Sequence, residues 1–139
     1  MAGKTVNNKF EEFLKSPDTV RVYSGDKLLF SSQAERLIPL LEYAAKFAPY
    51  QKDVTVLDRV VGNAAALLLK KILCKEVYSP LGSESAIQAL ESFGIMYHFN
   101  EVVPCIQDDS RQNLCPMEKM SLGKTPEEFY QLMSKKLNG

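Results

Sequence analysis

The sequence predicts an α/β domain in which a mixed sheet is covered by helices on both faces. Three observations lead to this fold class. A hairpin pattern lies near the start of the chain, two strand-to-helix units follow in its middle, and an amphipathic helix lies near its end. Because a strand that leads into a crossover helix returns as a parallel neighbour, the two units add parallel strands to the antiparallel hairpin.

The first third of the chain predicts helix, hairpin and helix. The first helix ends at Ser16-Pro17, because the residue before a proline disfavours helical backbone. Ser24-Gly25-Asp26-Lys27 supplies the glycine and aspartate of a tight hairpin turn. Pro49 marks the end of the second helix. The expected elements are helices at 8–14 and 37–48 and strands at 20–23 and 28–31.

The remaining two thirds repeat a strand-to-helix pattern. Ser83 is placed to cap one helix, which Gly94 would end. Thr125-Pro126-Glu127-Glu128 is a capping box with proline at the first helical position. A polar turn is expected at Asp108 to Asn113. The other expected elements are strands at 54–57, 76–79, 97–99 and 102–106, and helices from the Asp58 segment to about Ile72, from Ser83 to Gly94, and from Thr125 to Leu137.

Composition limits the class of protein. The 139 residues fit one domain, 1–139, with 45% hydrophobic and 24% charged residues. The 17 basic residues balance the 17 acidic ones, so charge gives no reason to expect nucleic acid as a partner. The longest apolar run, Ala64 to Leu69, is too short to span a membrane, and Met1 to Phe10 lacks a signal core. A cytoplasmic protein with reduced cysteines is expected.

The segment Asp58 to Leu69 places polar groups directly before an apolar helix. One interpretation makes Asp58 the N-cap of that helix. The other makes it a ligand-binding or acid–base group, with Gly62 allowing close approach of a ligand and Asn63 offering a donor and an acceptor. Arg59 would either bind an anion or lie solvated on the surface. Open α/β sheets bind ligands outside the carboxyl ends of their strands, which is where this segment is expected.

A second candidate is Cys115-Pro116-Met117-Glu118. The proline predicts a helical turn with the Cys115 thiol at its N-terminal edge, where the thiolate is favoured and a nucleophile is conceivable. The structural alternative is a packed thiol, with Glu118 bonding back to an N–H of its own turn.

A third candidate is the predicted loop Pro80-Leu81-Gly82-Ser83. Gly82 and Ser83 either bind a ligand there or only cap the following helix. No usual zinc site can be assembled, because His98 is the single histidine and the three cysteines lie ten or more residues apart. We therefore expect no metal ligand and assign His98 a structural hydrogen bond in a strand.

Five segments of the chain together resemble a known family. They are Asp58-x-x-Val61-Gly62-x-Ala64-Ala65-Ala66-Leu67-Leu68, Glu76-Val77-Tyr78, Ala89-Leu90-x-x-x-Gly94-Ile95, Val102-Val103-Pro104-x-Ile106 and Cys115-Pro116-Met117-Glu118. In order and spacing they resemble the family called domain of unknown function 1893, whose fold is similar to that of cytidine deaminase, and the resemblance covers roughly Val20 to Leu137. It implies a three-layer α/β/α domain with a mixed, about five-stranded sheet.

The resemblance also implies where a site would lie. In zinc deaminases the metal ligands and the acid–base glutamate stand at the N-termini of the two helices that follow the parallel strands. The corresponding segments here, Asp58 to Asn63 and Ser79 to Ser83, contain neither histidine nor cysteine. Zinc-dependent deamination is therefore not expected, although the pocket could persist.

Three functions remain open from the sequence. The first is a metal-free, deaminase-like domain that binds a small polar or nucleotide-type ligand and requires no cofactor. The second is a metal-independent enzyme that uses Cys115 or Asp58. The third is a homo-oligomeric module that pairs through exposed apolar faces of the helices Leu37 to Ala48 or Phe129 to Leu137. The candidate ligand-binding residues are Asp58, Arg59, Gly62, Asn63, Gly82, Ser83, Cys115 and Glu118.

Overall fold

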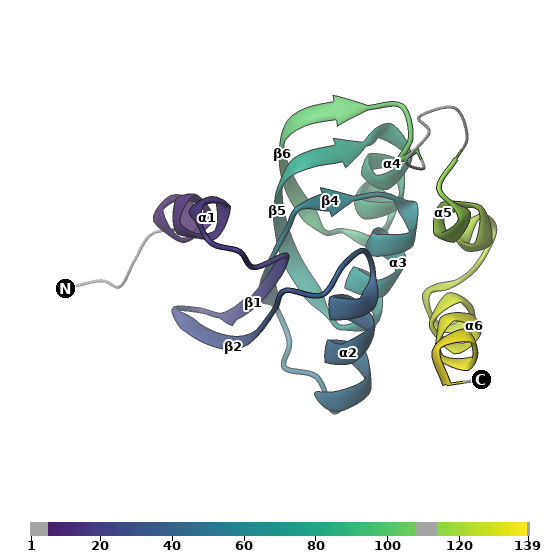
Figure 1. Cartoon of the computed structure of the whole chain (residues 1–139), viewed down its shortest axis with the longest axis horizontal. Coiled ribbons are helices and arrows are strands. Elements are labelled where there is room, and N and C mark those ends of the chain that lie inside the picture. Colours follow the sequence, from purple (N-terminus) through teal and green to yellow (C-terminus); the bar gives the residue numbers. More distant parts are fainter. Residues whose placement is uncertain (1–5, 108–113, 139) are drawn as a thin grey trace.

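The computed structural model describes residues 6–107 and 114–138, which form one open mixed sheet and six helices (Figure 1). The predicted turn at Asp108 to Asn113 lies outside the described residues. The strands are β1 (Val20–Ser24), β2 (Lys27–Ser32), β3 (Val54–Asp58), β4 (Val60–Val61), β5 (Cys74–Ser83) and β6 (Met96–Val103). The helices are α1 (Val6–Lys15), α2 (Ile38–Lys46), α3 (Asn63–Lys71), α4 (Glu84–Phe93), α5 (Pro116–Ser121) and α6 (Pro126–Asn138).

Local sequence signals account for most element boundaries. α1 ends before Pro17, and β1 and β2 pair antiparallel around the predicted turn. Gly94 forms the left-handed C-cap of α4. The capping box of α6 is present in both directions: the Thr125 N–H donates to Glu128 Oε1 (2.9 Å), and the Glu128 N–H donates to Thr125 Oγ1 (3.1 Å). These predictions are confirmed.

The sheet has the order β2-β1-β3-β5, and both strand-to-helix units place their strands in parallel as predicted. β6 pairs with one edge of β5 along most of its length. β3 and β4 therefore share the other edge, where they follow one another as an interrupted strand. Two expectations were wrong. The strand expected at 97–99 and the first two residues of the one expected at 102–106 form the single strand β6, residues 104–106 are not in a strand, and β4 was not predicted.

The two faces of the sheet carry unequal cores. On one face, β1, β3 and β5 contribute valines to a core that contains the buried run Ala64 to Leu69 of α3, with α2, α4 and α6 packed around it. On the other face, α1 buries Phe13 against Tyr23 and Leu57. Figure 1 shows α1 on the left of the sheet and α3 to α6 on the right. Helices thus contact both faces, but only α1 among the described helices lies on the second face.

The helix faces expected to join two copies of the chain are buried within one chain. Leu40, Leu41 and Tyr43 of α2 and Phe129 and Met133 of α6 all belong to the main core. The expectation that these faces are exposed was therefore wrong, and a homo-oligomer would need another surface. Within the described parts of the chain, no helix has the length and apolar character needed to cross a membrane.

Candidate functional site

The strand that leads to α3 is broken at Arg59. Leu57 of β3 pairs with Tyr78 of β5, whereas Val60 of β4 pairs with Leu81, so β5 runs continuously past the break. The Asp58 carboxylate accepts hydrogen bonds from the backbone N–H groups of Arg59 and Val60. The Asp58 carboxyl group therefore lies against the backbone at the point where the strand is interrupted.

Asp58 lies at the carboxyl end of β3 on the side of the main core. It pairs across the sheet with Val20, which belongs to that core, and it is only 5% exposed. Burial raises the pKa of its carboxyl from 3.8 to about 7, although the two backbone donors act in the opposite direction. Gly62, not Asp58, is the N-cap of α3. The N-cap interpretation of Asp58 was therefore wrong.

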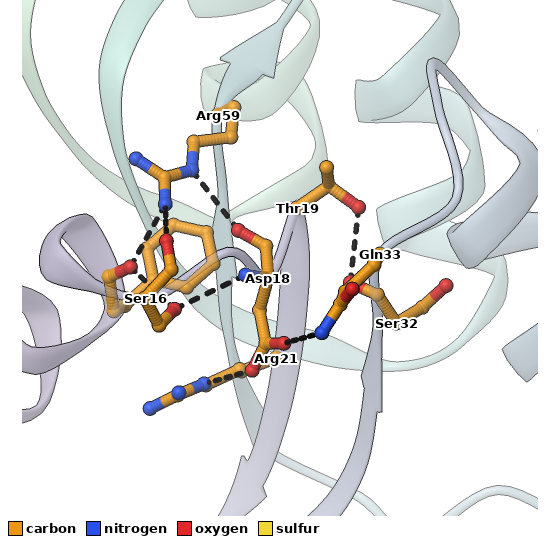
Figure 2. A network of polar contacts seen from close by, with 8 residues as sticks. Ser16, Asp18, Thr19, Arg21, Ser32, Gln33 and Arg59 are labelled. Atoms are coloured by element: carbon orange, nitrogen blue, oxygen red, sulfur yellow. Dashed lines mark hydrogen bonds and ion pairs between the residues drawn. The ribbon is translucent and has the colours of Figure 1, made fainter.

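The Arg59 side chain is hydrogen-bonded to the backbone at the C-terminal end of α1 and just after it. Its guanidinium donates to the backbone carbonyls of Phe13 (2.9 Å), Ser16 (2.7 Å), Asp18 (3.1 Å) and Leu14 (3.4 Å). It also lies over the Phe13 ring, 4.5 Å from its centroid. Figure 2 shows the side chain turned toward the backbone at Ser16 and Asp18. The interpretation of a solvated surface arginine was wrong, since the carbonyls that end α1 hold this side chain.

Glu118 supplies the cap that α3 lacks in its own sequence. Its carboxylate accepts from the N–H of Asn63 at Oε2 (2.9 Å) and from the N–H of Ala64 at Oε1 (2.7 Å). The Asn63 side chain is also used, because its amide donates to Ser121 Oγ (2.9 Å). Glu118 is 4% exposed, and burial raises the pKa of its carboxyl. It therefore does not bond back within its own turn, as the local interpretation expected.

Gly62 makes this contact between α5 and α3 sterically feasible. A Cβ at position 62 would lie 2.6 Å from Glu118 Oε2. Its backbone is extended, with φ of −107°, so any residue could adopt the conformation. The close approach that a glycine permits here is that of Glu118, a side chain of the same protein.

A cavity of about 300 Å³ lies beside these groups. Five of the eight candidate ligand-binding residues line it, namely Asp58, Arg59, Gly62, Cys115 and Glu118. Its apolar wall comes from Leu37, Ala64, Ala65 and Met117. Segments far apart in the sequence therefore meet around one space at the carboxyl end of β3. Whether these residues bind a ligand stays a prediction.

The other three candidates lie outside the cavity. Asn63 points to Ser121, and Leu81 to Ser83 form the end of β5 rather than the predicted loop. The Phe99 ring occupies the space that a Cβ on Gly82 would need. Ser83 caps α4, with its Oγ accepting from the Ala86 N–H (3.0 Å). The capping interpretation of this segment is confirmed.

Several lining residues were not among the candidate ligand-binding residues. Thr19, Arg36, Val60, Ile106 and Gln107 reach the cavity from strand ends and connecting segments. Arg36 is exposed and has a left-handed backbone, with φ of 60°, which a sequence does not reveal for an arginine. Only the folded arrangement brings these positions together.

The cysteines and the histidine form no metal-binding group in the part of the chain that the structure describes. All three cysteines are free, and burial raises the pKa of Cys74 to about 12. His98 hydrogen-bonds through Nε2 to Glu76 Oε2 (2.7 Å) and stacks on Tyr78, so the structural role predicted for it is confirmed. No three histidine, cysteine, aspartate or glutamate side chains gather to hold a metal within residues 6–107 and 114–138.

Fold and site define a mixed α/β domain with a carboxyl-lined cavity beside an interrupted strand. The chain belongs to the family described as "Domain of unknown function (DUF1893)", which it matches over residues 9–137. It is similar to the crystal structure, at 2.70 Å resolution, of a DUF1893 family protein (TM1506) from Thermotoga maritima, with a TM-score of 0.84. The two are 25% identical, over 97% of this chain and 93% of that chain. No curated protein matches the chain. The predicted family is thus confirmed, and the deaminase-like fold stays a prediction.

Proposed function

We propose that this protein binds a small polar ligand, of the size of a nucleobase or nucleoside, in the cavity beside Asp58. The observation that carries the proposal is a carboxyl group, 5% exposed, in the wall of a cavity of about 300 Å³. A titratable group whose pKa is strongly shifted by burial in a cleft is a frequent mark of a functional site. A ligand that donates a hydrogen bond to Asp58 would stabilise this buried carboxyl.

The size and lining of the cavity favour a small ring. Its volume lies at the lower limit of typical ligand pockets, which begin at roughly 300 Å³. Leu37, Ala64, Ala65 and Met117 provide an apolar wall, and the carboxyl of Asp58 provides an acceptor at one side. An apolar wall with a few fixed polar groups suits a flat heterocycle with a polar edge.

The arrangement of strands supports a deaminase-like frame for this proposal. If β3 and β4 are counted as one interrupted strand, the sheet has the five strands that the resemblance implies, with three of them parallel. The cavity lies where the first parallel strand leads into its helix. In a three-layer deaminase-like domain this is one of the two places that hold zinc ligands. In this proposal the carboxyl groups of Asp58 and Glu118, which line the cavity, contact the ligand in place of a metal.

Calorimetric titration with cytosine and cytidine tests the proposal. We expect saturable binding by the wild-type chain and loss of most of that binding in Asp58→Asn, because an amide replaces one acceptor oxygen with a donor. Asp53→Asn is the matched control: Asp53 is exposed, lies outside the cavity, and has a φ of 61°, which asparagine tolerates. Absence of binding by the wild type, or unchanged binding by Asp58→Asn, would overturn the proposal.

A metal-independent enzyme is the second candidate, because Cys115 lines the same cavity as Asp58. A nucleophilic thiol would react with a ligand held against the apolar wall. Timed alkylation by iodoacetamide, followed by peptide mass spectrometry, compares Cys115 with the half-buried Cys105 in the same sample. We expect faster alkylation of Cys115 and protection by a bound nucleoside. Equal rates for the two cysteines would exclude an activated Cys115.

A further inference from the structure

We propose that Glu118 acts as a built-in anion: its carboxylate fills the N-terminus of α3 and restricts the cavity to ligands that place no phosphate there. This inference rests on the proposed function, whose ligand class it narrows to unphosphorylated molecules with hydrogen-bond donors. The N-terminus of a helix ordinarily attracts phosphate, because its first N–H groups are unpaired and its dipole is positive there. In this protein a glutamate from α5, about 55 residues further along the chain, takes that place.

The two contacts use both oxygens of the carboxylate. The Asn63 N–H donates to Oε2 and the Ala64 N–H to Oε1, at 2.9 and 2.7 Å. These lengths are those of charge-assisted hydrogen bonds. Two residues further on, the Ala66 N–H makes the first bond of the helix itself, to the Gly62 carbonyl at 3.0 Å. A phosphate would therefore have to displace a buried carboxylate before it could reach the N–H groups of Asn63 and Ala64.

The fold supports this contact on both sides. Gly62 leaves the space that the carboxylate occupies, since a Cβ there would lie 2.6 to 2.7 Å from its three terminal atoms. Asn63 ties the same helix to α5 a second time, through the hydrogen bond of its side chain to Ser121 Oγ. Ser121 in turn donates to the Glu118 carbonyl (2.7 Å). Gly62 and Asn63 of one segment and Ser121 of α5 thus support the position of Glu118 independently of any ligand.

Besides Glu118, the acidic and basic side chains of the cavity lining are Asp58, Arg59 and Arg36, of which Arg36 is exposed. Asp58 contributes a second buried carboxyl group to the lining. The Arg59 guanidinium, which also borders the cavity, donates to four backbone carbonyls at the end of α1. The two buried polar side chains that line the cavity beside α3 are thus both carboxyl groups, and a molecule with amino or imino hydrogens can donate to the carboxyl oxygens of Asp58.

Inorganic phosphate is the direct probe. We expect no saturable phosphate binding by the wild type and saturable binding by Glu118→Ala, with a dissociation constant at least about tenfold below the highest phosphate concentration at which the wild type shows none, because the helix dipole and the freed N–H groups would attract the anion. Glu84→Ala is the matched control, because it removes one exposed negative charge from the first turn of α4, which keeps its own cap. Binding by calorimetry and chemical shifts of the Asn63 and Ala64 amides would report the site.

The outcomes separate the two proposals. Tight phosphate binding by the wild type, or no gain in Glu118→Ala, would overturn the role of Glu118 whatever cytidine does. If Glu118→Ala does not fold, Glu118→Gln retains one acceptor, and its Asn63 or Ala64 amide signal should respond to phosphate whereas the wild-type signals do not. In the wild type, cytidine 5′-monophosphate should bind no more tightly than cytidine. If neither binds, the proposed function fails while the phosphate result still tests Glu118.

Discussion

Two strand-to-helix junctions of this protein cap the N-terminus of the following helix in different ways. At the junction of β5 and α4, Ser83 caps the helix that it precedes, through a hydrogen bond to an amide three residues on. At the junction of β4 and α3, Gly62 has no side chain to offer, and Glu118 caps the helix from α5. The cap of α4 thus comes from a residue next to the helix, whereas the cap of α3 comes from a segment distant in the sequence.

The difference explains why only one junction borders the cavity. A serine cap needs no second segment, so β5 runs directly into α4 and Gly82 lies against Phe99. A glutamate cap needs α5 to approach, and the strand is interrupted just before the helix. Asp58 is left beside the space between them. The glutamate that caps α3 therefore also lines the candidate site.

The largest expected effect concerns Asp58, which has no counterpart at the other junction. Its native pKa of about 7 exceeds the unfolded value of 3.8, so the native state binds more protons between these values. Stability therefore falls as pH rises from about 4 to about 7, by about 4 kcal/mol at 1.36 kcal/mol per unit. Asp58→Asn should lack this fall, because its amide oxygen can accept from the same backbone donors.

Urea unfolding of both proteins between about pH 4 and about pH 8 measures this difference, since subtracting the curves removes groups common to both. Parallel curves would show that the Asp58 carboxyl titrates in the folded chain as it does in the unfolded one. The two junctions would then differ only in how their helices are capped, by Glu118 or by Ser83.

The second effect tests the distant cap. Glu118→Ala leaves the N–H groups of Asn63 and Ala64 without their partner, and we expect the free energy of unfolding to fall by about 3 kcal/mol. Glu84→Ala, at the first turn of α4, should change it by less than about 0.5 kcal/mol, because Ser83 remains. Equal losses in urea unfolding would mean that charge near a helix N-terminus, rather than the cap, decides stability.

The contrast also shows what could be predicted from the sequence. Signals contained in a few neighbouring residues, such as the hairpin turn, the Ser83 cap and the capping box at Thr125, predicted elements that the structure confirms. The break at Arg59 and the cap by Glu118 could not be predicted, because each depends on a partner more than 40 residues away. The polar residues at Asp58 and Cys115 were predicted as candidate site residues from the sequence. That both line the same cavity could be seen only in the folded structure.

The third effect concerns two glycines that are each in close contact with a different side chain, Glu118 at Gly62 and Phe99 at Gly82. Gly62→Ala and Gly82→Ala should each cost about 2 kcal/mol, because a Cβ would collide with Glu118 in one case and with the Phe99 ring in the other. A double-mutant cycle in urea separates them: Gly62→Ala should cost little once Glu118→Ala is present, whereas Gly82→Ala should remain additive. If both cycles were additive, the cost of Gly62→Ala would not come from a collision with the Glu118 side chain.

The smallest effect tests the local cap. Ser83→Ala removes the acceptor of the Ala86 N–H, and we expect a loss of about 1 kcal/mol in urea unfolding. Ser85→Ala is the control, since it removes the hydroxyl 2.9 Å from Ser83 Oγ but leaves the cap in place, and should cost less. Because Ser83 lies outside the cavity, neither change should alter cytidine binding. If Ser83→Ala weakened that binding, the two junctions would be coupled, and the cavity would depend on α4 as well as on Glu118.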